Sequence, residues 1–114
     1  MTLAKPAKIR QALRTMQDDD LQIRHEETDG HGSFFIDVNG QRVALQTYRR
    51  VDAQHVVINH THVDDSLRGR GVARRLLDAS VAWARETGTR IGATCPYSKA
   101  QFEKDPSIRD VFEA

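Results

Sequence analysis

Residues 56–73 read V-V-I-N-H-T-H-V-D-D-S-L-R-G-R-G-V-A, and the rest of the chain is organised around them. The first part is rich in β-branched residues, which favour a strand. Asp64, Asp65 and Ser66 are turn-forming residues. Gly69 and Gly71 then lead into apolar residues with helical spacing. This stretch therefore predicts a strand, a polar turn and a glycine-rich loop that opens a helix.

A glycine-rich loop at the start of a helix can bind anions. Glycine lets successive backbone N–H groups point in one direction. The first N–H groups of a helix have no partner within it, and the helix dipole adds partial positive charge. A phosphate or pyrophosphate suits such a cradle, and Arg68 and Arg70 add two full charges. In an α/β sheet we expect the ligand beyond the C-terminal end of the preceding strand.

The glycine spacing excludes two common phosphate-binding motifs. It is not G-x-x-x-x-G-K-S/T, and Arg74 stands where G-x-G-x-x-G needs its third glycine. The pattern Arg68-x-x-Gly71-x-Ala73 instead resembles the acyl-CoA pyrophosphate signature of the GNAT superfamily of N-acetyltransferases, R/Q-x-x-G-x-G/A. The alternative interpretation is a structural turn with solvated arginines.

Composition narrows the class of protein. At 114 residues the chain fits one domain with a modest core. A net charge of +1 argues against a nucleic-acid partner and against a membrane partner. The single cysteine, Cys95, cannot form an internal disulfide and fits a reducing compartment, so we expect a cytoplasmic protein. The longest apolar run, residues 81–84, is too short to span a bilayer, and we see no secretory signal.

Residues 1–20 are predicted to be an N-terminal extension of a domain that comprises residues 21–114. Ile9, Leu13 and Met16 recur at helical spacing, which predicts a short amphipathic helix from about Pro6 to Gln17. Partial disorder of this extension is the alternative.

The pattern after residue 20 predicts an α/β fold with a mixed sheet. We expect strands at 21–27, 33–38, 41–49 and 55–63, with a hairpin turn at Asn39-Gly40. A helix is expected over 71–86, ended by Gly88, then a strand over 90–95 and a mostly helical tail broken at Asp105-Pro106. The strands over 55–63 and 90–95 should be parallel, because a helix connects them. The expected buried stripe of that helix is Val72, Leu76, Ala79, Ser80 and Trp83.

The resemblance to the GNAT superfamily covers about residues 33–104 and is greatest to its short, single-domain members. It is carried by Asp37-x-x-Gly40 with Ala44 and Tyr48, by His60-Thr61-x-Val63, by R-G-R-G-V-A and by Cys95-Pro96-Tyr97. It implies an antiparallel meander followed by a β-α-β unit, with a coenzyme A (CoA) cradle at the strand-to-helix loop. The implied function is acetyl-CoA-dependent N-acetyltransfer to an amine, with acetyl-CoA as cosubstrate and no metal. The implied cofactor-binding residues are Thr61, His62, Val63, Arg68, Gly69, Arg70, Gly71, Val72, Ala73 and Arg74.

The same resemblance implies His60, Cys95 and Tyr97 as catalytic residues. His60 and His62 are two apart on a strand, so we expect them on one face, with Asn59 and Thr61 on the other. Histidine suits a general base near neutral pH, although Asp64, Asp65 or a water could replace it. Cys95 could be a general acid, an acyl-accepting nucleophile or a packing residue. A nucleophilic Cys95 would need an electropositive setting, which His60 could supply across the gap.

One departure from the superfamily pattern leaves the function open. Many GNAT enzymes carry a tyrosine in a Y-E-K run, whereas the corresponding run here is Phe102-Glu103-Lys104. Tyr97 could substitute, or the protein could be a non-catalytic acyl-CoA-binding module or regulatory subunit. A metal site built from His60, His62 and Cys95 is a further alternative. The acceptor, a small molecule or a protein amine, is not readable from the sequence.

Overall fold

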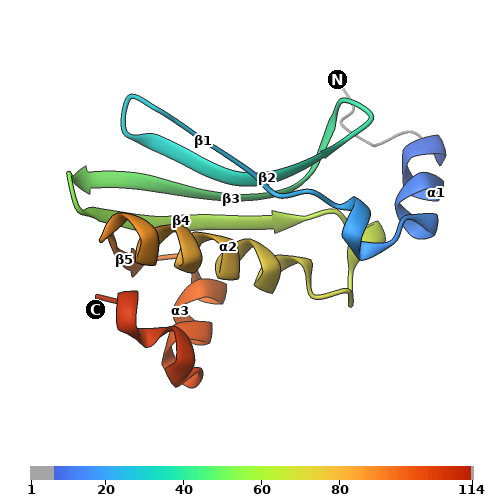
Figure 1. The fold of residues 1–114 in the computed structure, drawn as a ribbon. Helices are drawn as coiled ribbons and strands as arrows, with labels where there is room; N and C mark the ends of the chain where they lie inside the picture. Colours follow the sequence, from blue (N-terminus) through green and yellow to red (C-terminus); the bar gives the residue numbers. More distant parts are fainter. Residues whose placement is uncertain (1–6, 114) are drawn as a thin grey trace.

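The computed structural model describes the backbone of residues 7–113 and the side chains of residues 9–113. Within this range, five strands form one sheet in the order β1-β2-β3-β4-β5 (Figure 1). The strands are β1 (Arg24–Thr28), β2 (His31–Val38), β3 (Gln41–Asp52), β4 (His55–Val63) and β5 (Arg90–Ala93). The helices are α1 (Ala7–Thr15), α2 (Val72–Thr87) and α3 (Pro96–Lys104), with 3₁₀ turns η1 (Asp18–Asp20), η2 (Asp65–Leu67) and η3 (Pro106–Val111). None of the helices described is both long and apolar enough to cross a membrane.

The predicted mixed sheet is confirmed. Strands β1 to β4 form an antiparallel meander, and β5 pairs with β4 in parallel after the chain has passed through α2. Asn39 and Gly40 both have positive φ, 51° and 77°, as a two-residue type I′ hairpin turn requires. The C-terminal tail breaks between Lys104 and Pro106, as the proline predicts.

Some boundaries differ from those predicted. β5 ends at Ala93, because the N–H groups of Thr94 and Cys95 both donate to the carbonyl of Ile58 and stop the ladder. β3 runs three residues beyond its predicted end, to Asp52. The predicted N-terminal helix is present as α1, while its expected first residue, Pro6, lies outside the described residues.

Helix α2 packs against one face of the sheet, and α3 and η3 lie beside it (Figure 1). Its buried face is wider than predicted, because α2 is flanked by η3 as well as by the sheet. Leu77, Val81 and Ala84 are therefore buried in addition to the expected positions, whereas Ala79 and Trp83 stay partly exposed.

A β-bulge in β4 decides which side chains face α2. Thr47 pairs with His60 but its neighbour Tyr48 pairs with Ile58, so Asn59 is an extra residue in β4. Ile58 before the bulge and Thr61 after it therefore both face α2. The prediction that Asn59 shares a face with Thr61 is wrong. Its Oδ1 atom lies 2.5 Å from Thr47 Oγ1, on the face turned away from α2.

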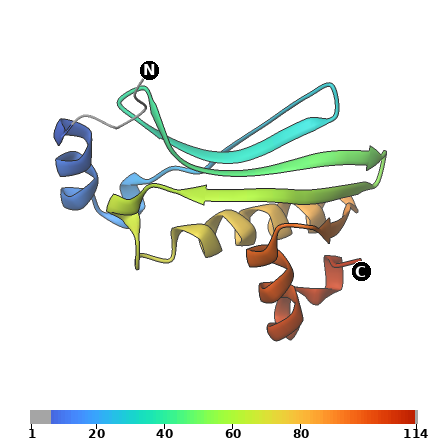
Figure 2. The same cartoon turned by 180° about the vertical axis from the view of Figure 1, so that it is seen from behind.

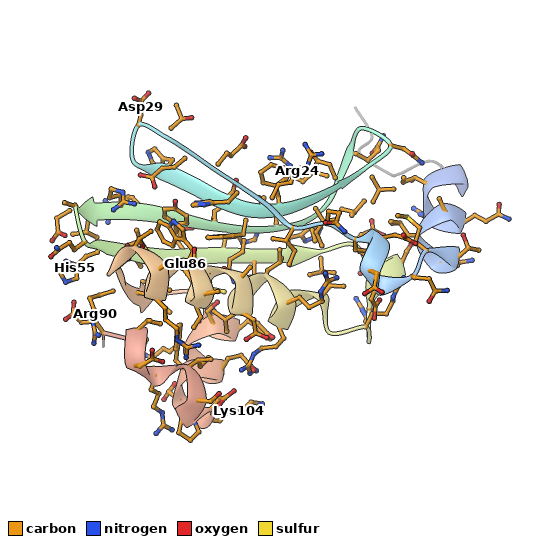
Figure 3. All side chains as sticks on the ribbon, in the orientation of Figure 1. Arg24, Asp29, His55, Glu86, Arg90 and Lys104 are labelled. Carbon is orange, nitrogen blue, oxygen red and sulfur yellow. The ribbon has the colours of Figure 1, made fainter. Side chains whose placement is uncertain are left out.

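Helix α1 lies at the end of the sheet where β4 ends (Figures 1 and 2). Ile9 and Leu13 are buried, and α1 packs against η2. The opposite end of the sheet is marked by His55 and Arg90, the first paired residues of β4 and β5 (Figure 3). The parallel pair therefore begins far from α1 and runs toward it.

Candidate functional site

The parallel strands β4 and β5 separate after Ile58. Their pairing covers only the first four residues of β4, whereas β4 continues to Val63. The N–H of Asp64 donates to the Val43 carbonyl in β3, 2.8 Å away. Because N–H groups alternate along a strand, those of Thr61 and Val63 point the other way, into the gap beside β5. The gap is therefore lined by backbone donors, as an oxyanion site requires.

The glycine loop joins this gap to α2. Gly69 and Gly71 have positive φ, 81° and 70°, and Gly71 is the N-cap of α2. No atom lies within 4 Å of a Cβ added at either glycine, so both face open space. No side chain caps the helix, and its first backbone bond runs from Arg75 N to Gly71 O. The amides of residues 72–74 thus emerge from the helix end without a helical partner, which fits a phosphate-binding site.

Two of the four arginines in and after the loop secure the N-terminal segment. Arg70 donates to the carbonyls of Leu13 and Met16, both at 2.7 Å, and to the Asp18 carboxylate. Arg75 donates to backbone carbonyls of the same segment. The Arg70 guanidinium, expected at the cofactor, thus binds the C-terminal end of α1, where a cation is favourable.

The other two arginines, Arg74 and Arg68, differ in how far other side chains hold their guanidinium groups in place. The guanidinium of Arg74 binds Asp78, Gln101 and Asp105, and so joins α2 to α3. Hydrogen bonds from Ser107 and then Arg74 hold the pKa of Asp105 at about 2. Arg68 is 81% exposed, and its one ion pair within residues 9–113 is with the similarly exposed Asp65, so its charge remains accessible to a ligand.

Cys95 lies at the gap, at the N-cap of α3. It is buried, and its Sγ atom is 3.4 Å from Thr61 Oγ1. Burial raises the pKa of the thiol. Hydrogen bonding from Thr61 and from Ser98 and Tyr97 outweighs burial, and the net pKa is lowered. The amides at the start of α3 therefore favour the thiolate.

His60 cannot supply the electropositive setting expected for Cys95. Cys95 contacts Thr61, which faces α2, whereas the bulge directs His60 and His62 to the opposite face. The two imidazoles are exposed there, with parallel rings 6.5 Å apart. The proposed metal site of these histidines with Cys95 is therefore wrong. Within residues 9–113 no group of three or more acidic, histidine or cysteine side chains could hold a metal.

Tyr97 lies in the first turn of α3 and is half-buried. Burial raises the pKa of its hydroxyl. Phe102 is fully buried and stacks on Phe112, with ring centroids 4.5 Å apart, so it is a packing residue. Of the two positions considered for a phenolic acid, only Tyr97 carries a hydroxyl.

The sequence interpretation missed Gln46 and Ser98. Both are 0% exposed, and among the described residues their side-chain polar atoms form no hydrogen bond of good geometry, although the Ser98 hydroxyl lies close enough to the Cys95 sulfur to help lower the pKa of the thiol. Gln46 is paired with Thr61 across β3 and β4. The available signal was a glutamine in the alternating hairpin strand on the same side as Ala44 and Tyr48.

Residues 33–111, which contain the gap, the glycine loop and α3, match the family model described as GCN5-related N-acetyl-transferase. The chain belongs to this family. Within it, Protein NATD1 of Bos taurus is 32% identical over 85 residues, covering 74% of this chain and 75% of that protein.

Solved structures agree with this assignment. The NMR solution structure of a GCN5-like protein from Staphylococcus aureus is 38% identical, with a TM-score of 0.65, and the match covers 82% of this chain and 89% of that one. An aminoglycoside N-acetyltransferase solved in complex with CoA is 17% identical, with a TM-score of 0.51 and coverage of 76% and 89%. That second likeness shows the shared GNAT fold.

Proposed function

We propose that the protein is an acetyl-CoA-dependent N-acetyltransferase that acts on an amine. One observation carries the proposal: the uncapped N-terminus of α2, begun by the left-handed Gly71, follows the same strand that diverges from β5 after Ile58. A pyrophosphate bound at the helix end would direct its acyl-pantetheine arm into the gap. The thioester would then lie near Thr61 and Cys95.

Each residue of the cradle has a proposed part in binding. The backbone amides of residues 69–74 would hold the pyrophosphate, with added charge from Arg68. Arg70 and Arg74 would contribute their N–H groups, since their guanidinium groups are engaged elsewhere. The backbone of residues 61–63 would line the pantetheine arm.

In a direct transfer, the amine nitrogen attacks the thioester carbonyl carbon. The amine loses a proton, the C–S bond breaks and the CoA thiolate leaves. A β4 amide, Thr61 or Val63, would donate to the oxyanion. His60 would take the amine proton if the acceptor approaches from the face turned away from α2, and Tyr97 would protonate the thiolate.

A two-step route through Cys95 is favoured by its lowered pKa and its place at the gap. The Cys95 thiolate would first accept the acetyl group as CoA thiolate leaves, and the amine would then attack the new thioester. Intact mass after incubation with acetyl-CoA alone distinguishes the routes. A gain of one acetyl group, abolished in Cys95→Ala, supports the two-step route, and full turnover by Cys95→Ala excludes it.

Thermal unfolding with acetyl-CoA tests the proposal, with ATP and NAD as phosphate-bearing controls. A ligand at ~100 times its Kd stabilises the folded state by about 2.7 kcal/mol. Gly71→Glu should abolish the shift. Gly88→Glu is the matched control, because Gly88 caps the other end of α2 with nearly the same φ, 69°, and equally open surroundings. Wild-type protein that does not shift at saturating acetyl-CoA would refute the proposal.

Release of CoA in the presence of amines separates an enzyme from the alternative, a non-catalytic acyl-CoA-binding module. That alternative is supported by the packing role of Phe102 where many GNAT enzymes carry a tyrosine. The acceptor set should include small-molecule amines and peptides with a free N-terminus or lysine. Binding without release of CoA across that set would favour the module.

A further inference from the structure

Two buried side chains have polar atoms without a well-formed hydrogen bond to any described residue. Among residues 9–113, only Gln46 and Ser98 have buried side-chain nitrogen or oxygen atoms without a hydrogen bond of good geometry, and of the two the Ser98 hydroxyl still contacts the Cys95 sulfur. Both the nitrogen and the oxygen of the Gln46 amide are unpaired. Leaving such groups unpaired in a protein interior is destabilising, so the Gln46 amide above all calls for a partner that the described residues do not supply.

The two side chains lie at the ends of one row that crosses the gap between β4 and β5. Gln46 in β3 is opposite Thr61 in β4. The Thr61 hydroxyl contacts the Cys95 sulfur, and Ser98 follows three residues later in the first turn of α3. The unpaired Gln46 amide and the Ser98 hydroxyl, whose contact is with the Cys95 sulfur, thus flank the point where β4 and β5 separate.

The surroundings of Gln46 are otherwise apolar. Phe34 is its neighbour in β2, and Ile58 and Val63 occupy the same face of β4. Buried polar groups elsewhere in this core are satisfied: the Ser80 hydroxyl donates to Leu77 O at 2.7 Å. A methionine or leucine at position 46 would suit this environment better, so the amide requires a reason other than stability.

We propose that Gln46 and Ser98 form the hydrogen-bonding end of a site for a short acyl group, and that Gln46 sets the acyl length accepted. This inference rests on the proposed acyl-CoA binding. The carbonyl of an acetyl thioester near Thr61 and Cys95 would accept a hydrogen bond from this row. A longer aliphatic chain would lie against the Gln46 amide and leave it unpaired, which disfavours that ligand.

The test compares acetyl-CoA with butyryl-CoA as ligands of Gln46→Met, which keeps the side-chain length and removes the polarity. The variant should unfold at an equal or higher temperature, since an unpaired amide has been removed. Its preference for acetyl-CoA, measured as the ratio of the two Kd values by calorimetry, should fall about 10-fold. Ser98→Ala should weaken acetyl-CoA binding, and Ser80→Ala, a buried helical serine with a satisfied hydroxyl, should leave it unchanged.

Distinct results separate the failure of this inference from the failure of the proposed function. If the wild type binds acetyl-CoA while Gln46→Met keeps the wild-type ratio, the amide serves an ordered water or the fold, and the acyl-length proposal is overturned. The same conclusion follows if Ser98→Ala and Ser80→Ala bind acetyl-CoA equally well. If the wild type binds neither thioester, the proposed function itself fails.

Discussion

Gly32 in β2 leaves space for the ring of Tyr48 in β3. A Cβ atom added at Gly32 would lie 2.1 Å from Tyr48 Cζ and 2.4 Å from its hydroxyl oxygen, far inside van der Waals contact. The ring cannot easily move away. It is 2% exposed and stacked on Trp83, and its hydroxyl donates to Glu27 and contacts a ring nitrogen of His25, both at 2.7 Å. Gly32→Ala should therefore displace the ring or separate the two strands.

The expected cost combines two effects. Overpacking costs about 1–3 kcal/mol. Loss of the hydrogen bond to Glu27, a charged carboxylate whose pKa is held at about 2 by Arg50 and Tyr48, adds about 1.5–3 kcal/mol. We expect a total of roughly 3–5 kcal/mol, or a fall in melting temperature of roughly 10–20 °C for a domain of this size.

Urea and thermal unfolding measure this cost, and two controls isolate the contact. Gly40→Ala places a Cβ in open space at a φ of +77°, and should cost only about 1–2 kcal/mol of backbone strain. In a Tyr48→Ala background the ring is gone, so Gly32→Ala should cost under ~0.5 kcal/mol or even stabilise the strand. The reasoning is refuted if Gly32→Ala costs no more than Gly40→Ala, or costs the same with and without Tyr48.

Three further predictions concern charged side chains. Arg70→Met should lower the free energy of unfolding by about 2 kcal/mol and speed proteolysis near α1, because the C-terminal end of that helix loses its hydrogen-bond donor. Its matched control, Arg68→Met, should leave the free energy of unfolding within ~0.5 kcal/mol but reduce the thermal shift caused by acetyl-CoA. Arg74→Met should destabilise the protein by about 1–3 kcal/mol in urea unfolding through the loss of α3 contacts, with the acetyl-CoA shift retained. Asp52 and then Glu113 raise the pKa of His55. The contribution of the His55 ion pairs to stability should therefore be complete below about pH 6.5 and be lost as the pH rises through the raised pKa. Melting temperatures measured between pH 5 and 9 should show this loss in the wild type and lack it in a His55→Gln variant.

Much of the fold follows from local features of the sequence. Asn39-Gly40 identified the hairpin turn, Gly88 the end of α2 and Pro106 the break after α3, because each residue acts through its own backbone geometry. The uncapped start of α2, which we propose as the CoA cradle, was likewise readable from Gly71 and the apolar residues after it, as glycine at a helix start leaves the amides uncovered.

What the sequence could not show depends on contacts between distant residues. Residues far away in the chain engage the charged groups of Arg70 and Arg74, namely Asp18 and Asp105, and no spacing rule pairs them. The β4 bulge was missed because a strict period of two has no place for an extra residue. The predicted interaction of His60 with Cys95 failed for that reason.

The bulge at Asn59 changes which residues of β4 face each side of the sheet. Ile58 and Thr61 are three residues apart and would face opposite sides of a regular strand, yet both face α2 because one extra residue lies between them. A regular strand that kept Asn59 within the pleat would instead direct His60 and His62, rather than Thr61, toward the sulfur, whereas deleting Asn59 would leave Thr61 where it is. When this chain is aligned with relatives, the placement of a one-residue gap near Asn59 therefore determines whether an imidazole or a hydroxyl is assigned to the side of the strand that carries Cys95.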